Sequence, residues 1–429
     1  MTYAEAIQFL YSLRLFGAKF GLENTLKLAA LAGHPQDRLR FIHVAGTNGK
    51  GSTCAMLESI YRAAGLRTGL FTSPHLVSFR ERIQVNRQLA SENEVVRLVE
   101  EIQPLLKQFP AGHHPTFFEV VTVMALKFFA EQKCDLVIWE TGLGGRLDAT
   151  NIVTPLASVI TNIALDHEQW LGDTLAQIAA EKAGIIKPGV PVITAVDEPE
   201  ALAVIEEVAR KQNAPLINVA QASRLHATAE TAALPLLGEH QKINAALALA
   251  TVNVLRSKIP ASDETIRVGL SKVDWPGRLQ MVTRSSGQTV LLDGAHNVAG
   301  AKVLRAALEK HFQFPRYTLV LGVFQDKDWR HICETLAPLA ARIFTVPVSS
   351  ERSADAHELA AACRAANPVA GIDACGALRE ALEKTAGDDF VVVTGSLYLV
   401  GEALELAGLS PATGGERALN EWTAKTPMR

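Results

Sequence analysis

The chain has 429 residues, of which 48% are hydrophobic and 20% charged, and its formal net charge at pH 7 is -3. This composition is typical of a globular protein of two or three domains, and it leaves no excess positive charge for wrapping nucleic acid or lying on an anionic membrane. Five scattered cysteines without C-x-x-C spacing argue against a disulfide framework or a zinc site. With no signal-peptide layout and no membrane-spanning run, we expect a cytoplasmic protein.

The first predicted elements are a strand, a glycine-rich turn and a helix. An apolar run at residues 41–45 leads into Gly46-Thr47-Asn48-Gly49-Lys50-Gly51-Ser52-Thr53. Apolar residues at helical spacing and a possible glycine C-cap follow: Leu57, Ile60, Tyr61, Ala64 and Gly65. Such a turn lets backbone N–H groups, a lysine and a helix N-terminus meet phosphate oxygens, and its hydroxyls can reach a metal. Val44 and the inserted Gly51 break the general nucleotide-loop pattern, so the pattern alone is weak. The strand–turn–helix setting, with Lys50 and the paired hydroxyls, favours a phosphate site over a turn that only connects a strand to a helix.

Continuous apolar runs then alternate with helical patterns, as expected for parallel strands covered on both faces. The strand-like runs are residues 136–139, 157–160, 192–196, 289–292, 318–323, 343–348 and 390–394, and helical stretches include 303–311 and 356–366. These patterns predict two successive α/β domains, residues 1–283 and 284–429, joined near Trp275-Pro276-Gly277 or Arg284-Ser285-Ser286-Gly287. Residues 197–237 are alanine-rich and have the weakest pattern.

Polar residues that directly follow predicted strands are candidates for chemistry, because ligands of open parallel sheets bind at the carboxyl ends of the strands. Glu140 ends one run and opens a glycine-rich loop, where a carboxylate suits magnesium, although a surface ion pair is the alternative. Asp166-His167 follows another run, and position alone leaves His167 equally balanced between a ligand and an ordinary hydrogen-bonded histidine.

Lys182 is unusual because it falls on the apolar stripe of a predicted helix that begins after Asp173 or Thr174. Burial would lower its pKa, and a neutral amine can react with carbon dioxide to give a carbamate that offers oxygen ligands. The alternatives are a side chain that extends to solvent or pairs with a carboxylate. From the residues alone, extension to solvent is favoured.

At these residues the chain resembles the folylpolyglutamate synthases and dihydrofolate synthases, ATP-dependent ligases related to the Mur ligases. The resemblance runs almost end to end, and the inserted Gly51 is itself the family's form. The motifs that carry it are Gly46-Thr47-Asn48-Gly49-Lys50-Gly51-Ser52, Thr72-Ser73-Pro74-His75-Leu76, Glu140 with Gly144-Gly145-Arg146-Leu147-Asp148-Ala149-Thr150-Asn151, Ala164-Leu165-Asp166-His167, Glu181-Lys182-Ala183-Gly184-Ile185, Pro276-Gly277-Arg278, Asp293-Gly294-Ala295-His296-Asn297 and Thr394-Gly395-Ser396.

The resemblance implies a Mur-ligase-like α/β fold, in which a P-loop ATPase-type parallel-sheet domain precedes a smaller Rossmann-like glutamate ligase domain. The implied nucleotide contacts are Thr47, Asn48, Gly49, Lys50, Gly51, Ser52, Asn244, Arg278 and Asp293. Magnesium would be held by Ser73, Glu140 and His167, with K⁺ as an additional cation, and Lys182 would be carbamylated. His296 matches an active-site histidine. By themselves Asn244 could cap a helix, and Arg278 and Asp293 could form an interdomain ion pair.

The resemblance also implies a dihydropteroate pocket lined by Thr116, Phe117, Phe118, Glu119, Leu147, Asp148 and Ala149. A Phe pair is otherwise more often part of a core. The expected reaction uses ATP to convert a carboxylate into an acyl phosphate, which the amino group of L-glutamate attacks, with dihydropteroate or a reduced folate as the other substrate. We expect a monomer whose domains close over the site. A Mur-type ligase for another carboxylate, or a regulatory module that only hydrolyses ATP, are the alternatives.

Overall fold

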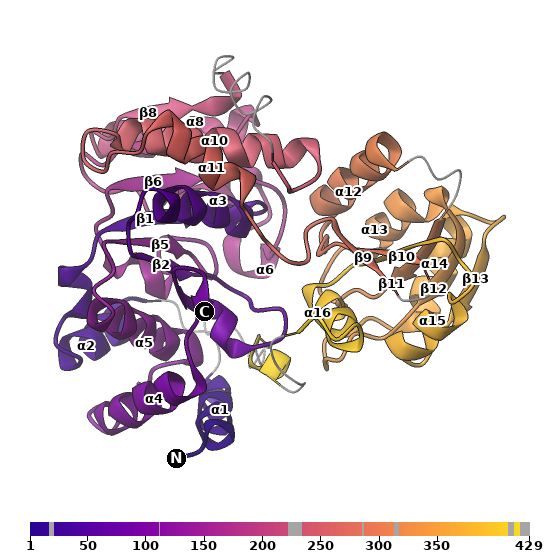
Figure 1. Ribbon diagram of the computed structural model, residues 1–429, viewed down its shortest axis with the longest axis horizontal. Helices are drawn as coiled ribbons and strands as arrows, with labels where there is room; N and C mark the ends of the chain where they lie inside the picture. Colours follow the sequence, from indigo (N-terminus) through magenta and orange to yellow (C-terminus); the bar gives the residue numbers. More distant parts are fainter. Residues whose placement is uncertain are drawn as a thin grey trace.

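The computed structural model describes residues 1–16, 21–110, 112–221, 234–284, 287–312, 317–410 and 416–420, which form two α/β lobes side by side (Figure 1). The N-terminal lobe contains an eight-stranded sheet of order β4-β3-β2-β5-β1-β6-β7-β8. Its strands are β1 (Phe41–Ala45), β2 (Thr68–Phe71), β3 (Ile83–Val85), β4 (Gln88–Leu89), β5 (Leu136–Glu140), β6 (Ala157–Ile160), β7 (Val192–Thr194) and β8 (Leu216–Asn218). The six strands β2, β5, β1, β6, β7 and β8 pair in parallel in this order. Strands β3 and β4 add an antiparallel edge next to β2.

Helices cover both faces of this sheet (Figure 1). They are α1 (Tyr3–Ser12), α2 (Glu23–Leu31), α3 (Lys50–Ala63), α4 (Glu92–Leu106), α5 (Phe117–Glu131), α6 (Glu168–Leu171), α7 (Leu175–Ala183), α8 (Pro199–Lys211), α10 (Glu239–Leu255) and α11 (Asp263–Ser271). Strand β1 is buried along its whole length, with Ile42 and Val44 in the core under α3 and α10 and Phe41 in the core under α4 and α5. The continuous apolar runs therefore reflect central strands that lie between two helical layers.

The C-terminal lobe contains a six-stranded sheet of order β13-β12-β11-β14-β10-β9. Its elements are β9 (Gln280–Thr283), β10 (Thr289–Leu292), α12 (Val298–His311), β11 (Tyr317–Leu321), α13 (Trp329–Leu336), β12 (Ala340–Thr345), α14 (Ala356–Ala366), β13 (Gly371–Ala374), α15 (Leu378–Lys384), β14 (Phe390–Thr394) and α16 (Leu397–Leu406), followed by the short 3-10 helix η7 (Glu416–Asn420). Strand β9 is antiparallel to β10 and the other pairs are parallel, which confirms the predicted α/β class with antiparallel edges added.

Arg284 and Gly287, the two ends of the predicted polar joint, lie within the second sheet. The Arg284 N–H donates to Gln288 O at 2.9 Å and the Gly287 N–H donates to Arg284 O at 2.9 Å, which closes the β9–β10 hairpin. Strand β9 therefore belongs to the second sheet although it precedes the predicted boundary at 283/284, because small polar residues mark a hairpin turn as well as a linker. Ser285 and Ser286 lie outside the described residues, as do residues 222–233 of the weakly patterned stretch.

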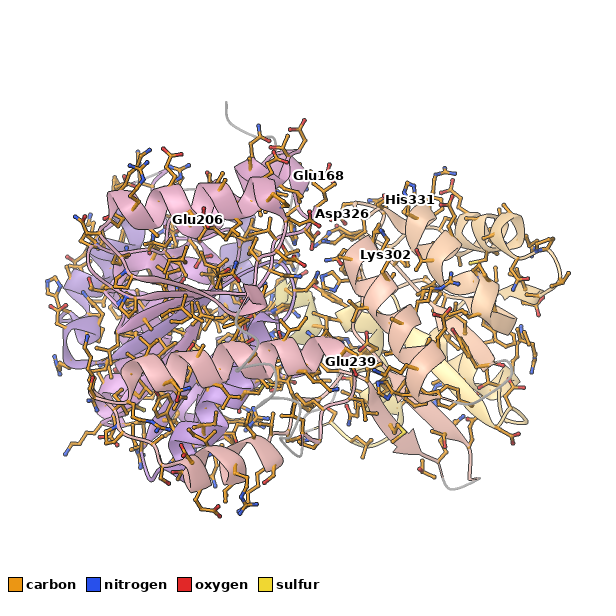
Figure 2. All side chains as sticks on the ribbon, turned by 90° about the horizontal axis from the view of Figure 1, so that it is seen from above. Glu168, Glu206, Glu239, Lys302, Asp326 and His331 are labelled. Atoms are coloured by element: carbon orange, nitrogen blue, oxygen red, sulfur yellow. The ribbon has the colours of Figure 1, made fainter. Side chains whose placement is uncertain are left out.

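The two lobes contact each other at the carboxyl ends of their central strands. Seen from above, Glu168 of the N-terminal lobe and Asp326 of the C-terminal lobe lie at facing edges (Figure 2). Glu239 at the start of α10 forms an ion pair with Lys310 of α12 at 2.8 Å. All five cysteines are free and buried, and within the described ranges the model contains no helix of the length and hydropathy that a bilayer crossing requires.

Candidate active site

The glycine-rich turn joins β1 to α3 and is held open by residues that follow β6. The Thr47 N–H donates to Asn162 O at 2.9 Å, and the Asn48 N–H donates to Asn162 Oδ1 at 2.8 Å. Gly46 has φ of +146° and its Cα faces Thr161 Oγ1 so closely that a Cβ would clash. Lys50 Nζ folds back to donate to Gly46 O at 3.1 Å and Thr47 O at 3.2 Å. The lysine amine, the turn and the N-terminus of α3 thus lie together, an arrangement suited to an anion.

Asn244 lies next to this turn. It is in the interior of α10, which excludes the helix-capping alternative, and it donates to Gln241 Oε1 at 2.9 Å. A Cβ on Gly49, whose φ is +84°, would stand 2.5 Å from Asn244 Oδ1, and a Cβ on Gly51 would stand 2.8 Å from the Trp275 ring. We call the turn at residues 46–53 the phosphate loop, after its predicted role. Gly49 and Gly51 let α10 and the segment around Trp275 approach this loop, and Asn244 lies against it.

Glu140 and Ser73 meet at the end of β5. Glu140 is 3% exposed, which excludes a surface ion pair, and its Oε2 accepts from the Ser73 N–H at 3.1 Å. Burial raises the pKa of Glu140 to about 7, against the opposing charges of Lys50 and Arg278. Ser73 Oγ is buried without a hydrogen-bond partner. A divalent cation fits this place, because it would neutralise the Glu140 carboxylate and take the Ser73 hydroxyl oxygen as a ligand.

Magnesium keeps several waters and needs only one or two protein carboxylates when phosphate supplies further oxygens. Within the described ranges, no group of three or more His, Cys, Asp or Glu side chains is arranged so that it could hold a metal ion. The Ser73–Glu140 pair therefore fits a magnesium ion shared with a nucleotide better than an ion held by protein alone.

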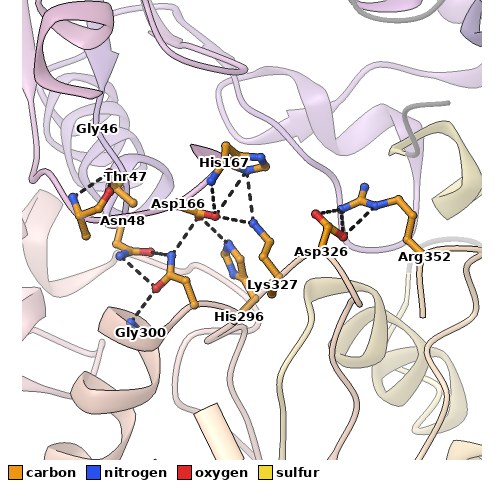
Figure 3. A network of polar contacts seen from close by, with 12 residues as sticks. Gly46, Thr47, Asn48, Asp166, His167, His296, Gly300, Asp326, Lys327 and Arg352 are labelled. Atoms are coloured by element: carbon orange, nitrogen blue, oxygen red, sulfur yellow. Dashed lines mark hydrogen bonds and ion pairs between the residues drawn. The ribbon is translucent and has the colours of Figure 1, made fainter. Parts of the chain in front are cut away.

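His167 belongs to a second polar cluster, the Asp166 cluster, which joins the two lobes (Figure 3). It consists of Asp166, His167, His296, Asn297 and Lys327. Lys327 Nζ lies 2.5 Å from Asp166 Oδ1 and 3.4 Å from His167 Nε2, and His296 Nε2 lies 3.8 Å from Asp166 Oδ2. Asn297 Nδ2 donates to Asp166 Oδ2 at 3.0 Å. Residues from the two lobes thus share one buried carboxylate.

The charges of this cluster follow from burial and proximity. Burial, together with the charge of Lys327, lowers the pKa of His167 to about 3 and that of His296 to about 4, so both imidazoles are neutral at pH 7. Burial opposes ionisation of Asp166, but at the low pH where this carboxyl titrates the protonated His167, Lys327 and the protonated His296 outweigh burial and lower its pKa. A neutral His167 is the form that can ligate a metal.

Asn297 also reaches the phosphate loop, because its Nδ2 donates to Asn48 Oδ1 at 3.1 Å. Neither Asn297 nor Lys327 was among the predicted site residues. Asn297 is the last residue of the motif that contains His296, so its sequence position was a usable signal. Lys327 lies in the segment that follows β11 and Gly322, and only the folded arrangement reveals its partner.

Lys182 lies at the end of α7, whose N-cap is Thr174 in a capping box with Gln177. The side chain is buried, which excludes extension to solvent, and Nζ donates to Gly46 O at 2.9 Å. Burial, with the charge of Lys50, lowers the pKa of Lys182 to about 7. The structure therefore places a partly neutral amine against the phosphate loop.

Arg278 and Asp293 both belong to the C-terminal lobe, where Asp293 is buried and Arg278 is half-buried. Asp293 accepts from the Leu279 and Ala295 N–H groups at 2.9 Å each, while Arg278 Nη1 donates to Gly277 O at 3.0 Å. In the described part of the chain no direct ion pair joins them, and both come from one lobe, so an interdomain ion pair is excluded. The charge of Arg278 reaches Glu140 across the lobe boundary.

The predicted pterin residues have local structural roles. Thr116 caps α5 in a capping box with Glu119, Phe117 is buried with its ring centroid 6.3 Å from that of Phe79, and Asp148 accepts from the Leu143 N–H at 2.8 Å. Phe118 packs against the glycine-rich loop, since a Cβ on Gly142 would stand 2.5 Å from its ring. The N-terminus of α5 and this loop are therefore neighbours. Leu147 lines a hollow of about 200 Å³ together with Leu143, Gly144, Arg146, Trp170, Leu171 and Glu181.

Comparisons with known proteins agree with this arrangement. Residues 44–252 match the family model of the Mur ligase middle domain, and residues 277–397 match that of the Mur ligase glutamate ligase domain. The chain is 37% identical over 426 residues to the dihydrofolate synthase/folylpolyglutamate synthase of Bacillus subtilis, covering 94% of this chain and 98% of that protein. It is 35% identical over 418 residues to the Escherichia coli protein of the same name, covering 94% and 95%.

Solved structures give the same result. The Mycobacterium tuberculosis folylpolyglutamate synthase complexed with ADP and AMPPCP superimposes with a TM-score of 0.86 at 30% identity, covering 96% of this chain and 100% of that one. E. coli FolC in complex with DHPP and ADP gives a TM-score of 0.82 at 31% identity, covering 95% and 97%. The chain belongs to the dihydrofolate synthase/folylpolyglutamate synthase family of the Mur ligases.

Proposed function

We propose that this chain is an ATP-dependent ligase that adds L-glutamate to reduced folates and to dihydropteroate, with release of ADP and phosphate. The observation that carries the proposal is the meeting of the two lobes at the phosphate loop, where Asn48 contacts Asn297 and Asp166 contacts Lys327. A ligase of this kind must bring a nucleotide and an amine together, and family membership supplies the substrate class. Both curated relatives described above carry the two activities in their names.

The first step activates the acceptor. A carboxylate is a poor acyl donor, since oxide would have to leave, and transfer of the γ-phosphoryl group from ATP gives an acyl phosphate with phosphate as the leaving group. Lys50 and the backbone N–H groups of Gly49 to Ser52 hold the phosphates and balance the charge that spreads over them during transfer. Asn244 contacts the adenine, and Arg278 and Asp293 bring further nucleotide contacts from the C-terminal lobe.

Ser73, Glu140 and His167 would hold magnesium, and the bound ion would supply Lewis-acid stabilisation of the phosphoryl oxygens. A carbamate on Lys182 adds a negative oxygen group beside the phosphate loop, where an ammonium would repel the cation. The proposal includes K⁺ as an additional cation, which replacement of potassium by sodium salts in the assay tests.

The second step forms the amide. The amino group of glutamate attacks the acyl carbon as a free amine, the new C–N bond forms, the C–O bond to phosphate breaks, and the amine loses a proton. His296 Nδ1 lies 2.7 Å from Gly294 O and therefore carries the ring hydrogen, which leaves Nε2 as an acceptor for that amine. The closed contact of the lobes at the Asp166 cluster keeps water from hydrolysing the intermediate.

The remaining parts of the proposal concern the other partners. Thr116, Phe117, Phe118, Glu119, Leu147, Asp148 and Ala149 line the dihydropteroate site, which the closeness of α5 to the 142–149 loop supports. We propose a cytoplasmic monomer, which the five reduced cysteines and the scattered exposed apolar side chains favour.

The test is phosphate release and product mass with a panel of dihydropteroate, tetrahydrofolate and methylenetetrahydrofolate. Release that requires both L-glutamate and a pteroate or folate, with a product heavier by one glutamate, is the expected result. Extension of tetrahydrofolate without conversion of dihydropteroate would reduce the assignment to a folylpolyglutamate synthase. Phosphate release without any acceptor, or activity only with an unrelated carboxylate, would overturn it.

A further inference from the structure

The short helix η7 near the C-terminus of the described chain lies against the N-terminal lobe, although it follows the last helix of the C-terminal lobe (Figure 1). Leu419 is 1% exposed and belongs to the same core as Phe79 and Phe117. Glu416 and Asn420 are also buried. We name residues 416–420 the C-terminal strap.

Glu416 makes the first anchor of the strap. Its Oε2 accepts from Tyr3 Oη at 3.0 Å, from Ser78 Oγ at 3.1 Å and from the Phe79 N–H at 2.6 Å. Its backbone oxygen lies 2.9 Å from His75 Nε2. One buried carboxylate and its own carbonyl therefore satisfy four donors of the N-terminal lobe, three of them in the segment from His75 to Phe79.

Asn420 makes the second anchor. Its Nδ2 donates to His75 O at 2.9 Å, and its Oδ1 accepts from Arg82 Nη2. Arg82 Nε donates to His75 Nδ1 at 2.9 Å, so the hydrogen of this imidazole is on Nε2, which donates to Glu416. Both ring nitrogens and the carbonyl of His75 are thus fixed, and two of these three contacts come from the strap.

His75 is two residues from Ser73, whose N–H meets the Glu140 carboxylate. The other end of the loop is closed by the Thr72 N–H, which donates to Arg82 O at 3.2 Å. The loop from Ser73 to Arg82 therefore contacts Glu140 through Ser73 and the strap through His75, Ser78 and Phe79. Movement of His75 would move Ser73, because only one residue separates them.

We infer that the C-terminal strap is a positioning element of the magnesium site, which holds the Ser73 loop at the distance from Glu140 that the cation requires. The inference rests on the proposed role of Ser73 and Glu140 and adds a part of the chain remote in sequence. Groups that fix metal ligands without touching the metal typically change metal affinity by about 10- to 100-fold when removed.

The strap is also tied to the C-terminal lobe. Arg417 forms a partly buried ion pair with Glu405 of α16, and α16 itself touches the loop, since a Cβ on Gly401 would clash with Leu76 O. The Ser73 loop therefore contacts two elements that are linked to the C-terminal lobe, the strap and α16. Correct docking of that lobe and correct geometry at Glu140 then depend on each other.

The experiment measures Mn²⁺ binding in the presence of AMPPCP by calorimetry, with no turnover required. Two shortened chains, ending at residue 420 and at residue 415, differ only in the strap, and Asn420→Ala removes a single anchor in the full chain. Asn367→Ala is the matched control, because Asn367 is likewise buried and donates to two carbonyls, Ala337 O at 2.7 Å and Ala340 O at 3.0 Å, away from the site.

We expect the chain ending at 415 and Asn420→Ala to bind Mn²⁺ about 10- to 100-fold more weakly than the chain ending at 420 and Asn367→Ala respectively. In turnover assays, the Mg²⁺ concentration for half activity should rise more than kcat falls, and excess Mg²⁺ should restore rate. Equal Mn²⁺ affinity in Asn420→Ala and Asn367→Ala would overturn the inference, even if the shorter chain fails to fold. Failure of the full chain itself to bind Mn²⁺ with AMPPCP would instead remove the magnesium site that the strap is said to position.

Discussion

A carbamate on Lys182 is the prediction that the structure makes most testable. The amine is buried, donates to Gly46 O at 2.9 Å and has its pKa lowered to about 7, so a large fraction is neutral and nucleophilic at pH 7.5. Lys182→Met keeps the length and apolar character of the stem but cannot form a carbamate. Lys182→Arg keeps a permanent charge and cannot form one either.

The magnitude follows from the pKa. A tenfold change in proton affinity is worth about 1.4 kcal/mol, so the change from 10.5 to about 7 means that the charged form of Lys182 is disfavoured by about 5 kcal/mol. We expect Lys182→Arg to lose stability on this order and Lys182→Met to lose little. Both should lose activity by about 10- to 100-fold or more, as for groups that orient metal sites.

The sign of the pH dependence is fixed by the same shift. Between pH 7 and 10.5 the unfolded chain carries a proton on Lys182 that the folded chain lacks, so stability rises with pH in this window. In buffer free of carbon dioxide, the free energy of unfolding of the native chain should rise with pH by about 1.4 kcal/mol per pH unit more than that of Lys182→Met. Urea titrations at several pH values measure this difference.

The modification itself is detected by a carbamate carbon signal after addition of ¹³C-bicarbonate, absent in Lys182→Met. Lys182→Ala should recover part of its activity with acetate, which can occupy the vacated space as a carboxylate. A fully active Lys182→Arg enzyme, or a native enzyme with full activity and no labelled carbamate, would refute the reasoning.

Two further predictions concern the phosphate loop and its support. Lys50→Ala should leave the fold intact, because the Lys50 amine donates to the loop carbonyls of Gly46 and Thr47 and is not part of the core. It should reduce glutamate-dependent phosphate release by at least about 100-fold. Circular dichroism and a phosphate assay check the two parts, and equal turnover would contradict the prediction. Gly145→Ala should lower the free energy of unfolding in urea by about 1–3 kcal/mol, because its Cβ would stand 2.9 Å from the carbonyl oxygens of Glu181 and Lys182. Gly387→Ala, with open space around its Cβ, should be neutral. Equal stabilities of the two variants would show that the loop shifts to accommodate the methyl group at no energetic cost.

The fold was predictable where the signal was local. Strands β10 and β14 and helix α14 have the predicted bounds, because each is an apolar or periodic run between breakers. Strands β3 and β4 were not predicted, since segments of three and two residues are too short to show a period. The turn between β9 and β10 was interpreted as a possible domain linker, because small polar residues and glycine occur in hairpin turns as well as in linkers.

The site was predictable only in part. Glycine spacing and strand ends indicated Lys50, Glu140 and His167, but the residues alone favoured an exposed Lys182, because periodicity shows which face is apolar and does not show what covers it. Lys327 lies 161 positions from Asp166, and Asn420 lies 338 positions from Arg82. No local pattern connects residues that far apart, so these partners needed the folded chain.

The pair of Asp166 and Lys327 explains why the two lobes meet where they do. Both side chains are about 7% exposed or less, and their charged atoms lie 2.5 Å apart across the lobe boundary. Removing either partner leaves a buried charge uncompensated, which typically costs about 3–5 kcal/mol, whereas removing both leaves no such charge. Asp166→Asn and Lys327→Met should each lower the thermal midpoint strongly, and the double variant should lose clearly less than their sum, by a coupling of about 1–3 kcal/mol. Strict additivity would mean that the pair contributes nothing to docking, and that the contact of Asn297 with Asn48, together with the strap, is sufficient to hold the C-terminal lobe on the phosphate loop.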